Sequence, residues 1–342
     1  MSTIVLTGGG TAGHVTACLA LIDRLKNDFD RFVYIGSHRG MERELVKAYP
    51  HVVYYAIDCI KLRRSLSPKN LAIPFVLARG TRQARRILRA EKPDVIFSKG
   101  GYVSLPVVRA AGRIPVVLHE SDRTMGLANR LARRKATILL SSFPLKSCTR
   151  TGSPLRPSLY RGSAAAARAR FGLTKPVLLV TGGSLGAARL NACVRNALPV
   201  LTRSYDVVHL TGKGKRDPNV IAPGYVQIEY EQDPADLFAC ADLVITRGGA
   251  NTLFELAALK KPMLVVPLGT ASRGDQIENA TYFVSHGLAR KLLEPDLTPD
   301  TLCAAVRDLA LAAPMLRDAL SRFDADGTDA VAAHVLRTAG KL

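Results

Sequence analysis

A short apolar run followed by a glycine turn and a helix occurs four times in this chain of 342 residues. The turns lie at residues 8–13, 100–101, 182–186 and 248–249, two in each half of the chain. Strand, turn and helix repeated in this way build a parallel sheet with helices on both faces. The pattern therefore predicts an α/β chain with two Rossmann-like, doubly wound parallel-sheet domains whose loop ends face one cleft.

The length suits two domains, because 342 residues are many for one hydrophobic core. Residues 151–157 have the composition of a turn, and an alanine-rich run that begins at Ala164 starts new helical structure. We therefore expect a first domain over residues 1–157 and a second over residues 158–325. Residues 326–342 form a final segment, in which a short helix from Thr328 can cross back to the first domain.

Cysteine spacing and hydropathy exclude several classes of protein. The six cysteines are scattered without a Cys-x-x-Cys pair, which favours reduced thiols over a disulfide framework or structural zinc. No stretch reaches the ~18 uninterrupted apolar residues of a membrane-spanning helix. The chain enters a strand at its first residues without a basic leader, so we expect no signal peptide.

Positive charge is concentrated in the first half. Residues 1–160 hold 27 Lys/Arg against 10 Asp/Glu, a balance of +17, whereas residues 161–342 hold 21 against 18, a balance of +3. The first half is therefore expected to meet a polyanion: an anionic bilayer face, a nucleic acid or a phosphorylated acceptor. Nucleic acid is disfavoured, since aromatic residues make up 6% and no recognition signature is present.

The most lopsided segment, residues 61–92, has ten basic residues and one acid interleaved with bulky apolar residues. Such a segment is typical of an element at a membrane surface. It is equally typical of a crossover helix with a solvated arginine face.

Residues 242–261 contain a strand at 243–245, a glycine turn and a predicted helix to about residue 259, with Asn251 and Thr252 as caps. A helix start after a glycine turn favours phosphate binding. Glu255, about one turn into the helix, can accept two hydrogen bonds from a ribose diol, or can interact only with the helix N-terminus. Further on, residues 263–266 are predicted as a strand and residues 268–279 as a polar loop.

The first glycine turn has the spacing G-x-G-x-x-G and precedes a helix predicted over residues 17–25. The next strand, residues 31–35, has no Asp or Glu at its end to hold an adenosine ribose, which disfavours NAD. His14 follows the turn, where a general base would face a cleft, although a lone histidine is more often structural.

The motifs taken in order resemble the MurG family, the peptidoglycan N-acetylglucosaminyltransferases of GT-B fold. They lie at residues 9–14, 99–104, 119–122 with 126–129, 152–156, 182–186, 247–255 and 273–280, and so cover nearly the whole chain. The resemblance implies transfer of GlcNAc from UDP-GlcNAc to the C4 hydroxyl of MurNAc in lipid I, giving lipid II with inversion. It also implies a peripheral enzyme on the cytoplasmic face of the cell membrane. Inversion by one displacement needs a general base and a stabilised diphosphate leaving group.

The resemblance also implies roles for individual residues. His14 is the candidate base or acceptor-orienting residue, with a hydrogen bond to the donor diphosphate as the alternative. The donor diphosphate would be held by Ser184, Gly183, Gly186 and Thr252. The uridine ribose would bind Glu255, and the uracil edge would bind the backbone near Glu231. The sugar hydroxyls would contact Gln276 with Asp275. The other donor-binding residues are Thr11, Ala12, Gly13, Asp122, Arg156, Ala250, Asn251, Leu253 and Phe254. Gly100, Gly101, Tyr102 and Asn129 would face the lipid-linked acceptor, and the first three are equally consistent with a tight structural turn.

Three positions depart from the family pattern. Ala12 stands where glycine is common, Asp122 replaces an asparagine, and Asp275 replaces a glutamine, so the last two place carboxylates near sugars or phosphates. No cofactor or metal is expected, because the Asp-x-Asp pairs at residues 28–30 and 324–326 do not follow a glycine loop.

The leading interpretation has partners in UDP-GlcNAc, lipid I and an anionic membrane surface. The alternatives are a GT-B transferase with a glycolipid or natural-product acceptor, and a UDP-GlcNAc 2-epimerase. An NAD-dependent oxidoreductase and a non-catalytic anion- or RNA-binding protein are disfavoured.

Overall fold

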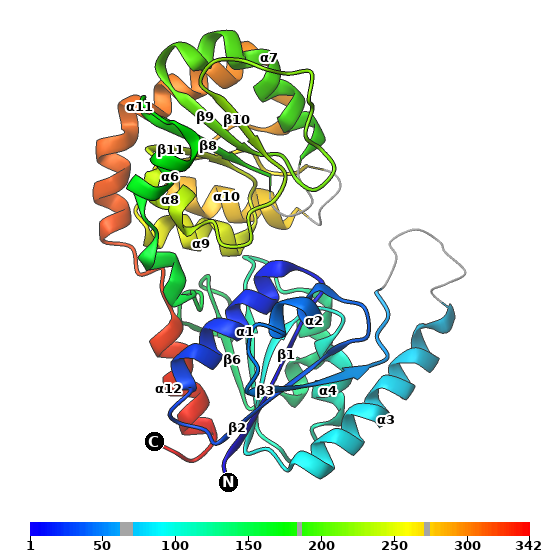
Figure 1. The fold of residues 1–342 in the computed structure, drawn as a ribbon. Coiled ribbons are helices and arrows are strands. Elements are labelled where there is room, and N and C mark those ends of the chain that lie inside the picture. The colour runs from blue at the N-terminus through cyan, green and yellow to red at the C-terminus, as the bar shows by residue number, and fades with distance from the viewer. Residues whose placement is uncertain (62–70, 183–186, 270–273) are drawn as a thin grey trace. The chain divides into compact units, whose positions relative to one another are not determined.

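The computed structural model describes residues 1–61, 71–182, 187–269 and 274–342. The chain divides into two compact units (Figure 1). Unit 1 comprises residues 1–156 and 326–342, and unit 2 comprises residues 157–325. The C-terminal segment therefore belongs to the same unit as the N-terminus.

Unit 1 contains a parallel sheet of seven strands in its described residues, in the order β3-β2-β1-β4-β5-β6-β7. The strands are β1 (Thr3–Gly8), β2 (Arg31–Ser37), β3 (Val52–Ile57), β4 (Val95–Gly100), β5 (Val116–Glu120), β6 (Ile138–Ser141) and β7 (Thr149–Arg150). The strand order reverses between β1 and β4. In open α/β sheets, ligands bind outside the carboxyl ends of the strands at such a reversal.

Helices cover both faces of this sheet (Figure 1). Ile4 and Leu6 of β1 pack with α1 (Ala12–Leu25), α2 (Met41–Val46) and α12 (Thr328–Thr338), whereas Val5 packs with α3 (Ile73–Glu91), α4 (Ser104–Ala110) and α5 (Leu127–Ala132). Successive strand residues point to opposite faces, so one continuous apolar strand serves two cores. α12 contributes Val331 and Val335 to the core that it shares with α1.

Unit 2 repeats the plan with the order β10-β9-β8-β11-β12-β13. Its strands are β8 (Val177–Thr181), β9 (Asp206–Leu210), β10 (Tyr225–Ile228), β11 (Leu243–Thr246), β12 (Met263–Val265) and β13 (Arg290–Lys291). Its α-helices are α6 (Ala164–Phe171), α7 (Ala188–Ser204), α8 (Ala235–Cys240), α9 (Ala250–Ala258), α10 (Asp275–Ser285) and α11 (Pro299–Ser321). The reversal lies between β8 and β11, so the glycine turn after β11 adjoins the ligand-binding position of the fold.

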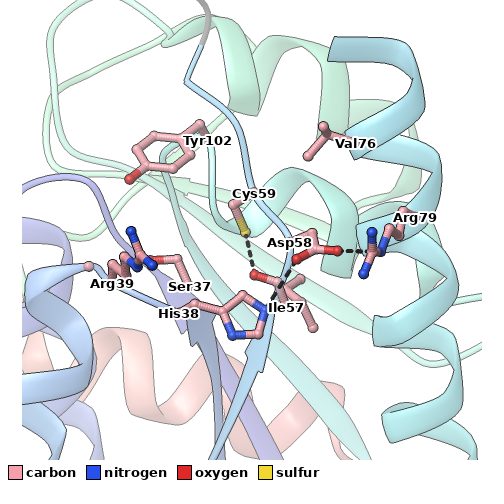
Figure 2. Close-up of a pocket in the computed structure, with 10 residues that line it drawn as sticks. Ser37, His38, Arg39, Ile57, Asp58, Cys59, Val76, Arg79 and Tyr102 are labelled. Carbon is pink, nitrogen blue, oxygen red and sulfur yellow. Dashed lines mark hydrogen bonds and ion pairs between the residues drawn. The ribbon is translucent and has the colours of Figure 1, made fainter. Parts of the chain in front are cut away.

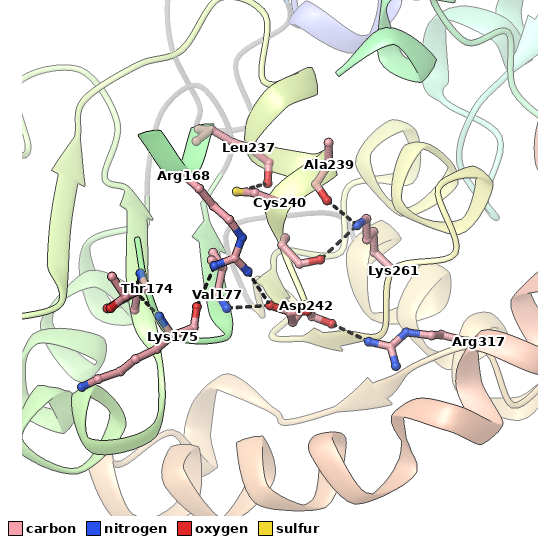
Figure 3. Close-up of polar contacts among 12 residues, drawn as sticks. Arg168, Thr174, Lys175, Val177, Leu237, Ala239, Cys240, Asp242, Lys261 and Arg317 are labelled. Carbon is pink, nitrogen blue, oxygen red and sulfur yellow. Dashed lines mark hydrogen bonds and ion pairs between the residues drawn. The ribbon is translucent and has the colours of Figure 1, made fainter. Parts of the chain in front are cut away.

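Asp242 holds together the opposite end of this sheet, where β11 begins (Figure 3). Its carboxylate accepts the N–H of Val177 at 2.7 Å and pairs with Arg168 at 3.4 Å, and its carbonyl accepts from Arg317 at 3.2 Å. Lys261 donates to the carbonyls of residues 239 and 241 at 2.9 and 3.0 Å. These bonds join β8, β11 and three helices at the amino ends of the strands. Ligands of this fold bind at the opposite, carboxyl ends.

Three local predictions are wrong. The helix predicted over residues 17–25 begins at Ala12, directly after the glycine turn. Asn251 and Thr252 do not cap α9: Gly249 is the N-cap, and both side chains lie inside the first turn. Residues 268–279 are not one loop, because α10 begins at Asp275, after Gly274 turns the chain with φ 84°.

The basic segment over residues 61–92 contains α3, a crossover helix as one of the two interpretations of this segment predicted. Residues 62–70 of this segment lie outside the described residues. α3 packs through Gly80, Ala84 and Leu88, and its arginines lie on the exposed face.

Candidate functional site

Two glycine loops of unit 1 meet at the strand reversal and hold His14 between them. The Nδ1 atom of His14 lies 2.9 Å from the carbonyl oxygen of Gly9. A Cβ atom on Gly101 would lie 2.3 Å from that oxygen and 3.1 Å from Nδ1, and Gly101 has φ 83°. Only glycine tolerates both the contact and the backbone angle. The second loop therefore packs directly against the first and against the imidazole.

The contact with Gly9 determines which nitrogen of His14 carries the proton. A carbonyl oxygen only accepts, so Nδ1 donates, and in the neutral ring the lone pair is on Nε2. The ring is half-buried at the first turn of α1. A neutral imidazole with a free Nε2 is the form that a general base requires.

Gly100 and Tyr102 complete the second loop. Gly100 has φ 98°, and a Cβ there would lie 2.7 Å from Oδ1 of Asn129. The ring of Tyr102 covers Gly10, where a Cβ would meet the ring at 2.8 Å. Burial, and secondarily the charge of Glu42, raises the pKa of Tyr102, so its hydroxyl remains protonated at neutral pH. Gly100 and Gly101 both have the positive φ of a tight turn, and the Tyr102 ring that follows them lies against the first glycine loop.

Glu120, at the end of β5, organises the next loop. Its Oε1 accepts from the backbone N–H groups of Ser121 and Asp122 at 2.9 and 3.1 Å. Its Oε2 accepts from the N–H of Gly126 at 2.9 Å and from Nδ2 of Asn129 at 2.8 Å. Asn129 is buried, and within the described structure its Oδ1 has no partner. Asn129 thus supports the loop and retains one acceptor atom.

Lys99 and His119 lie below these loops, on adjacent strands. Nε2 of His119 donates to the carbonyl of Gly152 at 3.0 Å, so Nδ1 accepts from Nζ of Lys99 at 2.7 Å. Both side chains are fully buried. Burial lowers the pKa of Lys99 to about 8, and burial together with the nearby lysine lowers the pKa of His119 well below its usual range.

Glu120, Lys99 and His119 lie within the predicted motifs, but the sequence alone assigned them no role. The available signal was position, because each is a polar residue at the carboxyl end of a buried strand. Such residues reach the ligand-binding edge of a parallel sheet.

In unit 2, side-chain bonds hold the turn after β11 in place. Oε1 of Gln276 accepts the backbone N–H groups of Gly248 and Leu268 at 3.3 and 2.9 Å, and Asn279 donates to the carbonyl of Gly248 at 3.0 Å. Arg247 pairs with Glu294 at 2.6 Å and is itself almost fully buried. The side-chain oxygen of Gln276 is therefore occupied by two backbone donors, and its amide N–H groups remain for another partner.

The predicted residues at the start of α9 differ in the burial of their side chains. The side chains of Leu253 and Phe254 are fully buried, and the Phe254 ring packs on Phe283 and Phe323. The side chains of these two residues therefore pack in the core, and Ala250 is also buried. The first backbone N–H groups of α9 have no acceptor within the helix. The half-buried residues at this end are Asn251, Thr252 and Glu255.

The remaining predicted residues lie at several places. In unit 1, Thr11 is the exposed N-cap of α1, Ala12 and Gly13 open that helix, and Arg156 ends the first segment with a buried Nε that has no partner in the described structure. In unit 2, Glu231 pairs with Arg170 at 2.9 Å and Asp275 is the first residue of α10. Gly183, Ser184 and Gly186 lie outside the described residues.

The described residues contain neither a metal-binding cluster nor a membrane-spanning helix. Among the described residues no group of three or more His, Cys, Asp or Glu side chains is arranged to hold a metal ion. In the same residues no helix is long and apolar enough to cross a membrane.

Comparison with known proteins places these features in a family. Relatives from Lachnospira eligens and Shouchella clausii are 50% and 49% identical over 323 residues, which cover 90% of this chain and 91% of each relative. Both are named UDP-N-acetylglucosamine–N-acetylmuramyl-(pentapeptide) pyrophosphoryl-undecaprenol N-acetylglucosamine transferase. The chain belongs to the MurG family.

Family models and solved structures agree with this membership. The glycosyltransferase family 28 N-terminal domain matches residues 4–141, and its C-terminal domain matches residues 177–328. A crystal structure of MurG from Acinetobacter baumannii has a TM-score of 0.77 at 26% identity and covers 98% of this chain and 100% of that chain. The predicted MurG resemblance and GT-B fold class are confirmed. A UDP-GlcNAc 2-epimerase from Neisseria meningitidis, at TM-score 0.69 and 15% identity over the whole of both chains, shares the fold alone.

Proposed function

We propose that this chain transfers N-acetylglucosamine from UDP-GlcNAc to the C4 hydroxyl of MurNAc in lipid I and so forms lipid II for peptidoglycan synthesis. The extensive identity to the transferases from Lachnospira eligens and Shouchella clausii supports this activity. The observation that carries the mechanism is the hydrogen bond between Nδ1 of His14 and the carbonyl of Gly9. In the neutral ring this bond leaves the lone pair on Nε2, at the ligand-binding edge of the sheet in unit 1.

In this mechanism His14 is the general base. Nε2 takes the proton of the C4 hydroxyl while the C4 oxygen attacks C1 of GlcNAc, and the bond from C1 to the UDP oxygen breaks. One displacement inverts the configuration at C1. The resulting imidazolium keeps its Nδ1–H bond to Gly9, which holds the ring in orientation while it carries charge.

The developing charge on UDP requires hydrogen-bond donors on unit 2. The N-terminus of α9, with Asn251 and Thr252, supplies backbone N–H groups and a favourable dipole for the diphosphate. Ser184 and its neighbouring glycines share that role in the proposal. Glu255 takes the ribose diol, and the free amide N–H groups of Gln276 donate to hydroxyls of the transferred sugar.

Unit 1 would contact the membrane through α3 and through Leu71, two residues before it. Leu71 and Phe75 are 77% and 78% exposed, and the exposed face of the helix carries Arg79, Arg82 and Arg86. Exposed apolar side chains beside arginines favour binding to an anionic bilayer at its surface. We therefore place the enzyme peripherally on the cytoplasmic face of the cell membrane, where it would serve cell-wall growth, cell shape and division.

Vesicle binding tests this location. The protein should sediment with vesicles that contain anionic lipid and bind zwitterionic vesicles weakly, and Phe75→Ser should weaken the binding without changing turnover of a soluble acceptor. Equal binding of Phe75→Ser and the unaltered protein would remove α3 from the membrane contact.

The direct test of activity uses radiolabelled UDP-GlcNAc and a short-chain analogue of lipid I, with EDTA present and UDP-GalNAc as a control donor. Labelled disaccharide should form without added metal, and UDP-GalNAc should be a poor donor. His14→Ala should lower kcat by about 10²–10⁴ with donor binding mostly kept. Unchanged turnover would remove His14 from the mechanism. Binding of the donor without product would leave the fold assignment intact and refute the acceptor, and conversion of the donor alone would indicate an epimerase.

A further inference from the structure

Unit 1 has a cavity of about 460 Å³ next to the glycine loops. Its walls are the loop after β2 (residues 37–40), the end of β3 (residues 57–59), Val76 and Arg79 of α3, and Tyr102 (Figure 2). The described side chains around it are mainly polar or charged. The cavity therefore offers charged side chains to an ionic group, on walls whose exposed surface is mostly apolar.

Asp58 bonds to two basic side chains of this pocket. Its Oδ1 lies 3.2 Å from Nε2 of His38, and its Oδ2 lies 2.6 Å from Nε of Arg79 and accepts from Nε2 of Gln83 at 3.0 Å (Figure 2). Gln83 also accepts the N–H of Asp58 at 2.7 Å. Both carboxylate oxygens are thus occupied by side chains of the pocket wall. Asp58 holds these side chains in place and does not offer a free oxygen to a cationic ligand.

The positive charge of the pocket exceeds what Asp58 neutralises. Arg79 bonds to Asp58 through Nε, so the two terminal amino groups of its guanidinium remain for another partner. Arg39 lines the same cavity and makes no ion pair or hydrogen bond with the described residues. Arginine side chains present paired N–H donors that match the two oxygens of a carboxylate. The pocket therefore has the charge and the donors for an anion.

Tyr102 connects this pocket to the site around His14. Its ring covers Gly10 in the first glycine loop and also lines the cavity. The loop that carries Tyr102 contacts His14 through Gly101. A substrate with its reacting hydroxyl at His14 can consequently place a neighbouring substituent past Tyr102 and into the pocket.

We propose that the pocket binds a carboxylate of the peptide branch of the acceptor. This assignment rests on the function proposed above and specifies how the same acceptor is recognised. The acceptor named for the relatives carries a pyrophosphoryl group and a pentapeptide on one N-acetylmuramyl sugar. The peptide is attached through the lactyl group on C3, next to the reacting C4, whereas the diphosphate is on C1 across the ring. A peptide joined through its N-terminus has a free carboxylate at its other end, and that carboxylate is the group that Arg39 and Arg79 would bind.

The test compares two acceptors with two proteins, and it adds one control variant and one control acceptor. The acceptors are a short-chain lipid I analogue with its pentapeptide and the same diphosphate in which a lactyl amide replaces the peptide. The proteins are the unaltered enzyme and Arg39→Gln, whose side chain is exposed and therefore dispensable for the fold. Arg113→Gln is the matched control, because it removes one exposed arginine from the turn before β5, at the opposite end of the same sheet.

Arg39→Gln should raise KM for the pentapeptide acceptor about tenfold, the effect of one lost hydrogen bond between charged groups. It should leave KM for the peptide-free acceptor and for UDP-GlcNAc unchanged, and Arg113→Gln should behave like the unaltered enzyme with both acceptors. A pentapeptide acceptor with its carboxylates converted to amides should show no difference between Arg39→Gln and the unaltered enzyme.

Other outcomes overturn the assignment. An equal rise in KM for both acceptors would indicate that Arg39 binds the diphosphate, and no rise for either would show that the pocket does not contact the acceptor. If the unaltered enzyme transfers sugar to neither acceptor, the proposed function itself fails and the assignment falls with it.

Discussion

Replacement of Lys99 by methionine should change how the stability of unit 1 depends on pH. The side chain is fully buried, its Nζ donates to His119, and burial lowers its pKa from 10.5 to about 8. Methionine has a similar length and no charge. Between pH 8 and 10.5 the unfolded chain keeps a proton on Lys99 that the folded chain has lost, so the folded form gains stability as the pH rises through this window.

The size of the effect follows from the pKa difference. A shift of two to three pH units corresponds to about 3 kcal/mol. The free energy of unfolding of the unaltered protein minus that of Lys99→Met should therefore rise by about 3 kcal/mol from below pH 8 to above pH 10.5. Taking the difference removes the titration of the groups that Lys99 does not influence, and His119, which it does influence, has a pKa well below this window.

Urea unfolding at a series of pH values measures this difference. A thiol-labelling pulse at one fixed pH, followed by mass spectrometry of the Cys18 peptide, reports unit 1 separately, because Cys18 is fully buried there. Lys146→Met, which removes an exposed lysine of the same unit, controls for the loss of one charge. A difference that stays flat with pH would refute the inference that burial depresses the Lys99 pKa, and a decrease would show that the pKa is raised instead.

Three further substitutions test the support of the site. Gly101→Ala places a methyl group against a backbone carbonyl at positive φ, so it should destabilise unit 1 by ~2 kcal/mol or more and lower kcat in the transfer assay. The control Gly112→Ala, at φ 62° with open space around it, should destabilise unit 1 by about 1 kcal/mol and leave kcat unchanged. Glu120→Gln turns an amide group toward two N–H donors, so it should raise KM for the acceptor severalfold and speed amide exchange in residues 121–129; an unaltered exchange pattern would contradict this role. Glu294→Ala leaves the buried Arg247 without its partner and should destabilise unit 2 by about 3 kcal/mol in urea unfolding, whereas a change below about 1 kcal/mol would show that water replaces the carboxylate.

Local sequence determined the repeated α/β plan and most of its elements. β2 (Arg31–Ser37) and β11 (Leu243–Thr246) contain the strands predicted at residues 31–35 and 243–245, because a continuous apolar run bounded by polar residues has few other stable conformations. The glycine turns were readable because a positive φ, as at Gly100 and Gly101, is a property of one residue and its neighbours. The order of the motifs along the chain was also sufficient to indicate the family.

Tertiary structure decided what the individual side chains do. Within one helix, Leu253 and Phe254 turned into the core while Thr252 remained half-buried, a distinction set by the packing of α9 against α10. The sequence around His14 does not show which of its nitrogens carries the proton, because that depends on the approach of Gly9. The contact of Lys99 with His119 and the pocket around Asp58 join residues from different strands and helices. The order of strands in the sheet creates those contacts, and that order depends on the packing of the whole unit rather than on any short stretch of residues.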